Sequence, residues 1–95
     1  DQTTKVRGMF VQPGHVDAVA KRHAEILKAR LVVEGEMAND RMTLKVEAAN
    51  TASAFAEAVA ATLRDVTKLR GEVQIVAPGS LPNDGKVIED ARKYD

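Results

Sequence analysis

The chain has 95 residues and a mass of 10.3 kDa, which is enough for one domain with a modest core. Its 14 basic and 14 acidic side chains cancel, and only 3% of its residues are aromatic, so it lacks the charge and the stacking groups that nucleic-acid binding uses. The absence of cysteine excludes disulfides, thiolate metal sites and a cysteine nucleophile, and no apolar run is long enough for a transmembrane helix. We therefore expect a globular domain that binds neither nucleic acid nor a membrane.

The first ordered segments are expected within residues 5–24. Residues 5–11, KVRGMFV, are prone to form a strand, and the glycine in the middle indicates a bend or a close backbone approach. Pro13 suits the first position of a helix. Residues at helical spacing follow it and predict a helix from 13 to about 24: Val16, Val19, Ala20 and His23.

Two strands with a polar loop between them are predicted next. Residues 30–36 contain a short β-branched run, and residues 42–48 alternate between apolar and polar side chains. The loop that joins them, residues 35–41, is polar and rich in turn formers. This pattern is typical of an antiparallel hairpin.

The second half of the chain predicts a helix, a strand and a loop. Apolar side chains recur at helical spacing from Phe55 to Leu69, several N-cap residues precede them, and Gly71 suits the C-terminal cap. Residues 72–77 predict a last strand, and residues 78–85 are dense in turn formers. The polar residues 87–95 predict a short helix or a frayed tail.

The order of these elements is β-α-β-β-α-β. It predicts an α+β fold in which a small antiparallel sheet carries two helices on one face, the ferredoxin-like layout, followed by a C-terminal loop and tail.

Most catalytic motifs are missing from the sequence. Phosphate-binding glycine motifs and zinc-protease motifs are absent, and His15 and His23 without a nearby carboxylate make a poor metal site, so we expect no metal. We interpret them as one surface histidine and one half-buried histidine. The loop at 78–86 differs, because it places Lys86 beside glycine and proline residues. Such a lysine can carry one positive charge to a phosphate or a carboxylate, although a Gly-Lys pair is also common in plain exposed turns.

Two segments resemble a known family. Residues 1–13, DQTTKVRGMFVQP, are similar to a hinge and the strand that follows it, and residues 81–88, LPNDGKVI, are similar to a loop that carries a catalytic lysine. Both are features of the small C-terminal domain of the AMP-forming, adenylate-forming ligases, and the phenylacetate–CoA ligase family is the most similar. The resemblance covers essentially all of residues 1–95, because the order of elements between the two segments also matches.

The resemblance implies a two-step reaction in a larger enzyme. ATP and an aryl acid such as phenylacetate give an acyl-adenylate, and CoA then displaces AMP to give a thioester. The family uses Mg2+ with ATP, and we expect none of these molecules to bind this domain tightly on its own. The large N-terminal domain would be the partner of this chain, which begins at Asp1 without a methionine and is expected to be inactive as an isolated fragment. The resemblance further implies a cytoplasmic enzyme of aromatic compound catabolism, and a homodimer is compatible with it.

Residue roles are implied in the same way. Lys86 matches the lysine that stabilises the charge of the adenylation transition state, and Gly85 gives its loop, residues 78–88, backbone freedom. Asp1 matches the hinge of a domain rotation that separates the two steps. Arg7 and Gly8 match a strand that faces the active site during thioester formation, where a missing side chain would let the pantetheine arm of CoA pass.

The lysine loop departs from the family in length. Only two residues separate Pro82 from Gly85, which is shorter than the usual spacing, whereas counting from Pro78 gives a longer one. Two other classes of function therefore stay open. One is an ACT-like module that senses small molecules, which amino-acid binding and gel filtration would reveal, and the other is an interaction domain with an exposed apolar patch.

Overall fold

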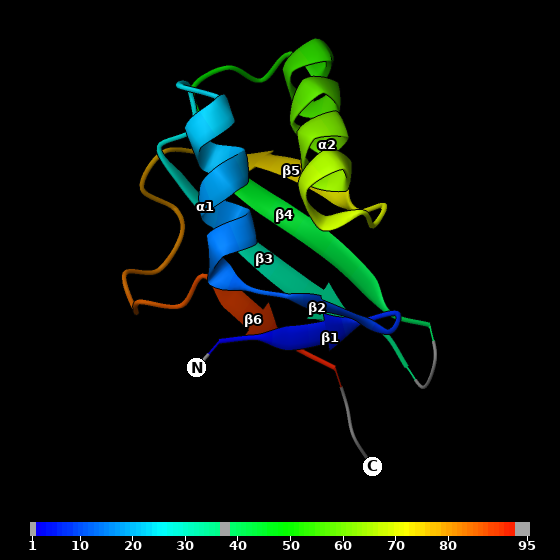
Figure 1. Ribbon diagram of the computed structural model, residues 1–95. Helices are drawn as coiled ribbons and strands as arrows, with labels where there is room; N and C mark the ends of the chain where they lie inside the picture. Colours follow the sequence, from blue (N-terminus) through cyan, green and yellow to red (C-terminus); the bar gives the residue numbers. More distant parts are fainter. Residues whose placement is uncertain (1, 37–38, 93–95) are drawn as a thin grey trace.

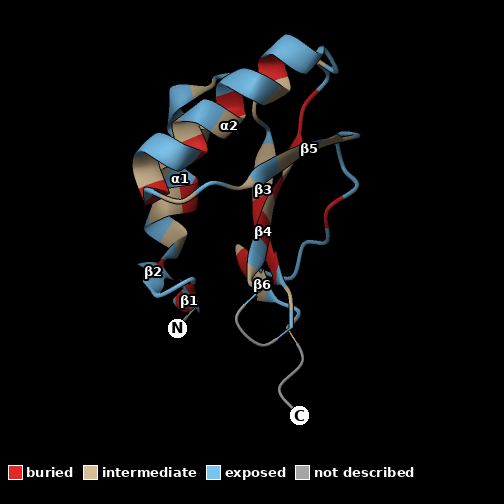
Figure 2. Ribbon diagram, turned by 90° about the vertical axis from the view of Figure 1, so that its right-hand side faces the viewer, coloured by how far each residue is buried: buried red, intermediate tan, exposed pale blue. Residues whose placement is uncertain are grey.

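Two helices lie against one face of a four-stranded sheet in the computed structural model, which describes residues 2–36 and 39–92 (Figures 1 and 2). The helices are α1 (Pro13–Arg22) and α2 (Ser53–Thr67). The strands, in their order across the sheet, are β5 (Glu72–Val76), β4 (Arg41–Glu47), β3 (Lys28–Glu34) and β6 (Ile88–Asp90). The predicted α+β class with both helices on one face is confirmed.

The alternation of side chains along β3 and β4 decides where the core lies. Leu31, Val33, Leu44 and Val46 are fully buried and belong to one apolar cluster with residues of both helices. The alternate positions point to the opposite face of the sheet, which carries charged side chains, because successive residues of a strand face opposite ways. This outer face is the one on which the candidate site is built.

The sheet is mixed, so the prediction of an antiparallel sheet is wrong in this respect. Strands β3 and β4 form the expected antiparallel hairpin, but β4 pairs with β5 in parallel and β3 pairs with β6 in parallel. The helix α2 connects β4 to β5 and returns the chain to the same end of the sheet, which makes the two strands parallel. Residues 88–90, predicted as helix or tail, form β6.

The predicted strand at 5–11 is a hairpin outside the main sheet. Strand β1 (Thr4–Val6) pairs with β2 (Met9–Val11), and Arg7 and Gly8 form the turn with φ values of +47° and +83°. Positive φ values at both residues of a two-residue turn give the backbone a twist that matches the twist of the two strands in a hairpin. Val6 and Val11 are fully buried in the main core, which fixes the hairpin to the rest of the domain.

The ends of the helices follow from their sequences, with one correction. Helix α1 begins at Pro13 as predicted. Helix α2 ends at Thr67 and is capped by Lys68, which takes the left-handed conformation with φ +65°, so the predicted cap at Gly71 is wrong. Gly71 is needed for packing instead, since a Cβ there would lie 2.9 Å from side-chain atoms of both Leu63 and Met42.

Neither helix of the described ranges is both long enough and apolar enough to cross a membrane.

Candidate functional site

The loop that contains Lys86 crosses the outer face of the sheet. It leaves β5 at one edge and enters β6 at the opposite edge, on the side of the sheet that faces away from the helices (Figure 2). Leu81 is buried in the middle of this loop and is only 8% exposed. The loop is therefore packed against the domain rather than extended into solvent.

Two oppositely charged side chains hold the first half of the loop. Glu47 accepts hydrogen bonds from the backbone N–H groups of Gly79, at 2.8 Å, and Leu81, at 2.9 Å. These N–H groups, helped by the charge of Lys28, hold the pKa of Glu47 below its ordinary value. Lys28 is the register partner of Glu47 on the neighbouring strand, and its ammonium group donates to the carbonyl of Pro82 at 2.7 Å and to the side-chain oxygen of Asn83 at 2.6 Å.

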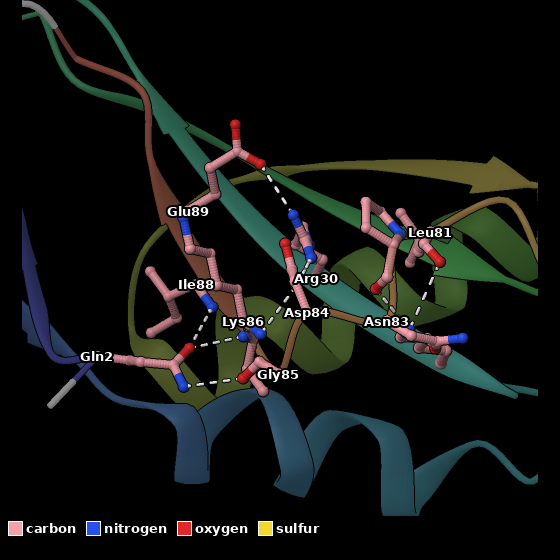
Figure 3. Close-up of polar contacts among 12 residues, drawn as sticks. Gln2, Arg30, Leu81, Asn83, Asp84, Gly85, Lys86, Ile88 and Glu89 are labelled. Carbon is pink, nitrogen blue, oxygen red and sulfur yellow. Dashed lines mark hydrogen bonds and ion pairs between the residues drawn. The ribbon is translucent and has the colours of Figure 1, made fainter.

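A buried arginine holds the second half of the loop. Arg30 of β3 is 5% exposed, and its guanidinium group pairs with Asp84 and, at 3.1 Å, with Glu89 (Figure 3). Asp84 also accepts a hydrogen bond from the backbone N–H of Lys86 at 3.0 Å. That N–H, followed by Arg30, lowers the pKa of Asp84. The backbone of Lys86 is thereby attached to the middle of the sheet.

The side chain of Gln2 reaches the same loop from the other end of the chain. Its oxygen accepts hydrogen bonds from the backbone N–H groups of Val87, at 2.6 Å, and Ile88, at 3.2 Å, and its nitrogen donates to the carbonyl of Gly85 at 3.1 Å (Figure 3). The sequence analysis missed Gln2, because no local pattern marks a contact across 83 positions of the chain.

Lys86 itself is exposed and lies two residues before β6. It lines a pocket of about 300 Å3 together with residues 2–4 and 88–90. Its ammonium group makes no hydrogen bond or ion pair with any other residue that the structure describes. Gly85, immediately before it, has a φ of +76°, a conformation that favours glycine. The Lys86 side chain thus has no partner among the described residues, while the backbone around it is held by Asp84 on one side and by Gln2 on the other.

Arg7 and Gly8 lie elsewhere, in the turn of the β1–β2 hairpin and not on a strand as predicted. The backbone N–H of Arg7 donates to Asp40 at 3.0 Å, which is the main cause of the lowered pKa of Asp40, and the Arg7 side chain contacts the carbonyl of Arg70. Asp40 also pairs with Arg92 at 3.1 Å. Apart from Gly8 and its two chain neighbours, no described residue has a heavy atom within 4 Å of where a Cβ of Gly8 would be, so another molecule has room to approach its backbone.

The predicted site residues do not form one cluster. Arg7 lines a pocket of about 680 Å3 near residues 34–36 and 39–41, and this pocket shares no described residue with the pocket beside Lys86. Asp1, the predicted hinge, lies outside the described residues. Among the described residues, Lys86 and the hairpin turn therefore line different pockets.

The histidines have structural partners. His15 accepts a hydrogen bond from the backbone N–H of Gln12 at 2.9 Å at the start of α1, and His23 bonds to the Thr62 hydroxyl at 2.7 Å. Both are half-buried, so the prediction that one of them lies on the surface is wrong. Across residues 2–36 and 39–92, no group of three histidine or acidic side chains is placed to hold a metal ion.

Comparison with known proteins identifies the family and the fold of the chain. A family model described as the AMP-binding enzyme C-terminal domain matches residues 8–92. A domain of phenylacetate-coenzyme A ligase from Bacteroides vulgatus ATCC 8482 is 21% identical, with a TM-score of 0.85 over 100% of this chain and 97% of that chain. No curated protein matches the sequence significantly.

Longer solved structures contain the same fold as one part. 2-Hydroxyisobutyryl-CoA ligase in complex with 2-HIB-AMP and CoA in the thioesterification state is 25% identical, with a TM-score of 0.84 over 98% of this chain. The same ligase in the postadenylation state with R3-HIB-AMP is 24% identical, with a TM-score of 0.77 over 95% of this chain. This chain spans 22% of the length of each of these two ligase structures.

Proposed function

Since this chain belongs to the family of AMP-binding enzyme C-terminal domains, we propose that it is the mobile C-terminal domain of an AMP-forming CoA ligase that acts on an aryl acid such as phenylacetate. The observation that carries the proposal is the ammonium group of Lys86, which has no partner among residues 2–36 and 39–92 and stands on a loop whose backbone is anchored on both sides. The large N-terminal domain of the same polypeptide would bind ATP, Mg2+ and the acid. The isolated chain is then expected to fold without turning over substrate. We place the enzyme in the cytoplasm, in the catabolism of aromatic compounds.

The proposed role of Lys86 follows from the charge that builds up during adenylation. A carboxylate oxygen of the acid attacks the α-phosphorus of ATP, a new oxygen–phosphorus bond forms, and the bond to the departing pyrophosphate breaks. Negative charge accumulates on the oxygens around the α-phosphorus in the transition state. An ammonium group that reaches those oxygens lowers the barrier, because it binds the transition state more tightly than the ground state.

The hairpin turn is proposed to serve the second step. The thiol of CoA loses its proton and attacks the acyl carbonyl, the thioester bond forms, and AMP leaves. Arg7 and Gly8 would line the path of CoA when the domain turns about Asp1, since the turn and Lys86 lie on separate surfaces. The existence of thioesterification and postadenylation states of 2-hydroxyisobutyryl-CoA ligase supports such a pair of poses.

The experiment that tests the proposal measures the two steps separately in the full-length ligase. Lys86→Ala is expected to lower the rate of pyrophosphate release from ATP and phenylacetate by about 100-fold or more, which is the usual effect of removing one group that stabilises developing charge. Thioester formation from supplied acyl-adenylate and CoA should stay close to the wild-type rate. Lys21→Ala is the matched control, because Lys21 is an exposed lysine whose pairing is with Asp17 on the same helix.

Two results would contradict the proposal. Unchanged pyrophosphate release in Lys86→Ala would remove Lys86 from the reaction and favour the small-molecule-sensing class. An equal loss in both steps would assign Lys86 a role that is not specific to adenylation.

A further inference from the structure

We infer that Gln2 is a positioning residue for Lys86, because its carboxamide fixes the loop around the lysine to the segment that follows the hinge. This inference rests on the proposed function, in which Lys86 stabilises the adenylation transition state. Its hydrogen bonds to the described residues are all with backbone groups, so the role we infer is one of position and not of chemistry.

Gln2 contacts the residues that come directly before and after Lys86 in the sequence. The carboxamide binds the carbonyl of Gly85 before the lysine and the N–H groups of Val87 and Ile88 after it. β6 is the last strand of the sheet, and its other edge is bound to β3, where Leu31 donates to the carbonyl of Val87 at 2.8 Å. Gln2 therefore occupies the open edge of β6 at its beginning, where the backbone would otherwise be free to shift.

The chemistry of the side chain matches this position. A carboxamide offers an acceptor and a donor on one planar group, and here both are used. A glutamate would keep the acceptor but place a second oxygen against the Gly85 carbonyl, and an alanine would lose all these bonds. The length of the side chain matters too, because asparagine is one methylene shorter.

The second anchor of the loop explains why Gln2 should affect rate more than folding. Asp84 accepts the backbone N–H of Lys86 and pairs with Arg30 of the sheet, and neither of these contacts involves Gln2, so we expect both to persist when Gln2 is removed. Gln2 adds the connection to residue 1, the proposed hinge. With it, the lysine loop turns with the domain as one body, and without it the ammonium group reaches the α-phosphate less often in the right geometry.

The test uses the full-length ligase with Gln2→Ala, Gln2→Glu and Gln2→Ala combined with Lys86→Ala. We expect Gln2→Ala to lower kcat of adenylation by about 10- to 100-fold, the scale of a small misplacement of a reacting group, while KM for ATP and the thioester step change little. Gln2→Glu should fall between Gln2→Ala and wild type. Adding Gln2→Ala to Lys86→Ala should cause almost no further loss, because the two residues act through the same group.

Amide hydrogen exchange supplies a readout that is independent of activity. Val87 and Ile88 should exchange faster in Gln2→Ala, because their N–H groups lose the Gln2 acceptor, while amides in α2 should not change. Gln74→Ala is the matched control, since Gln74 is an exposed glutamine on β5. It should leave both steps and the exchange of Val87 unchanged.

The outcomes separate this inference from the proposed function. If Lys86→Ala abolishes adenylation but Gln2→Ala leaves it intact, the positioning role is wrong and the proposed function stands. If Gln2→Ala lowers both steps and the melting temperature together, Gln2 is only a structural residue. If Lys86→Ala retains adenylation, the proposed function fails and the role of Gln2 fails with it.

Discussion

At the scale of single residues, the glycine before Lys86 decides how the lysine is presented. Gly85 has a φ of +76°, and no described residue beyond its chain neighbours has a heavy atom within 4 Å of its Cβ position. We therefore expect Gly85→Ala to cost only what a left-handed backbone costs, about 1–2 kcal/mol. We expect slower adenylation in the full-length ligase, because the backbone relaxes and moves Lys86. Measuring the free energy of unfolding and the rate of pyrophosphate release of the Gly85→Ala ligase tests both expectations.

The same loop contains a matched control for that substitution. Gly79 has a φ of +85° and equally open surroundings, but it lies at the other end of the loop. Gly79→Ala should cost about the same 1–2 kcal/mol of stability and leave adenylation intact. Equal loss of adenylation in both variants would show that general strain, and not the position of Lys86, controls the rate.

At this scale the sequence marked only residues that belong to a local motif. Lys86 and Gly85 were chosen from such a motif, and their roles stay predictions. Gln2 and Arg30 were not found, because each acts on residues more than 50 positions away and neither sits in a local pattern. Long-range contacts of this kind become visible only once the strand order is known.

At the scale of elements, the attachment of the lysine loop depends on the ionised form of Glu47. Its carboxylate accepts hydrogen bonds from two backbone N–H groups of the loop, which lower the pKa of Glu47 in the folded protein. The carboxylate therefore contributes its full stabilisation above the pKa that Glu47 has in the unfolded chain. This stabilisation is lost as the pH falls through the lower pKa of the folded state. Glu47→Gln should therefore lower the melting temperature most near pH 7. The difference from wild type should shrink below about pH 4.3, the ordinary pKa of glutamate.

Melting curves at several pH values test this attachment. Glu57→Gln is the control, because Glu57 is exposed on α2, and its difference from wild type should be small at every pH. A Glu47→Gln difference that stays constant from pH 7 to pH 3 would contradict the role of the ionised carboxylate.

The sequence predicted the long elements and missed the short ones. Both helices and the strands β3, β4 and β5 have enough periodic apolar residues to mark them. The hairpin strands and β6 have three residues each, too few for a pattern, and they are stabilised by partners elsewhere. The turn at Arg7 and Gly8 was also missed, because Arg-Gly is a weaker hairpin signal than Asn-Gly.

At the scale of the whole molecule, one apolar layer between the helices and the sheet holds the domain together. Leu31 is fully buried and lies on β3, between Leu44 of β4 and Ile88 of β6 in the pairing register. Leu31→Ala should lower the free energy of unfolding by about 2–5 kcal/mol, a large share of the total for a small domain. Chemical denaturation measures this loss.

An exposed leucine close by in the sequence is the control. Leu27 is 65% exposed, so Leu27→Ala should change stability by less than about 0.5 kcal/mol. Similar losses in the two variants would mean that the helix–sheet layer is not the main source of stability.

The overall class was predictable, whereas the direction of the strands was not. The order of the elements, each recognised from its hydrophobic periodicity, predicted two layers with the helices on one side. Whether β5 and β6 run parallel to their neighbours depends on how the connections cross the sheet, and the loop at 77–87 carries no sequence signal of crossing it.

The crossing of that loop has a consequence for how the protein is made. β6 is synthesised after all the other strands, yet it pairs with β3, which is completed more than 50 residues earlier. Until residues 88–90 leave the ribosome, the apolar edge of β3 has no neighbour and is open to pairing with other chains. The segment that closes this edge directly follows Lys86, so we expect Lys86 to become ordered in the same event that covers the exposed edge of the nascent domain.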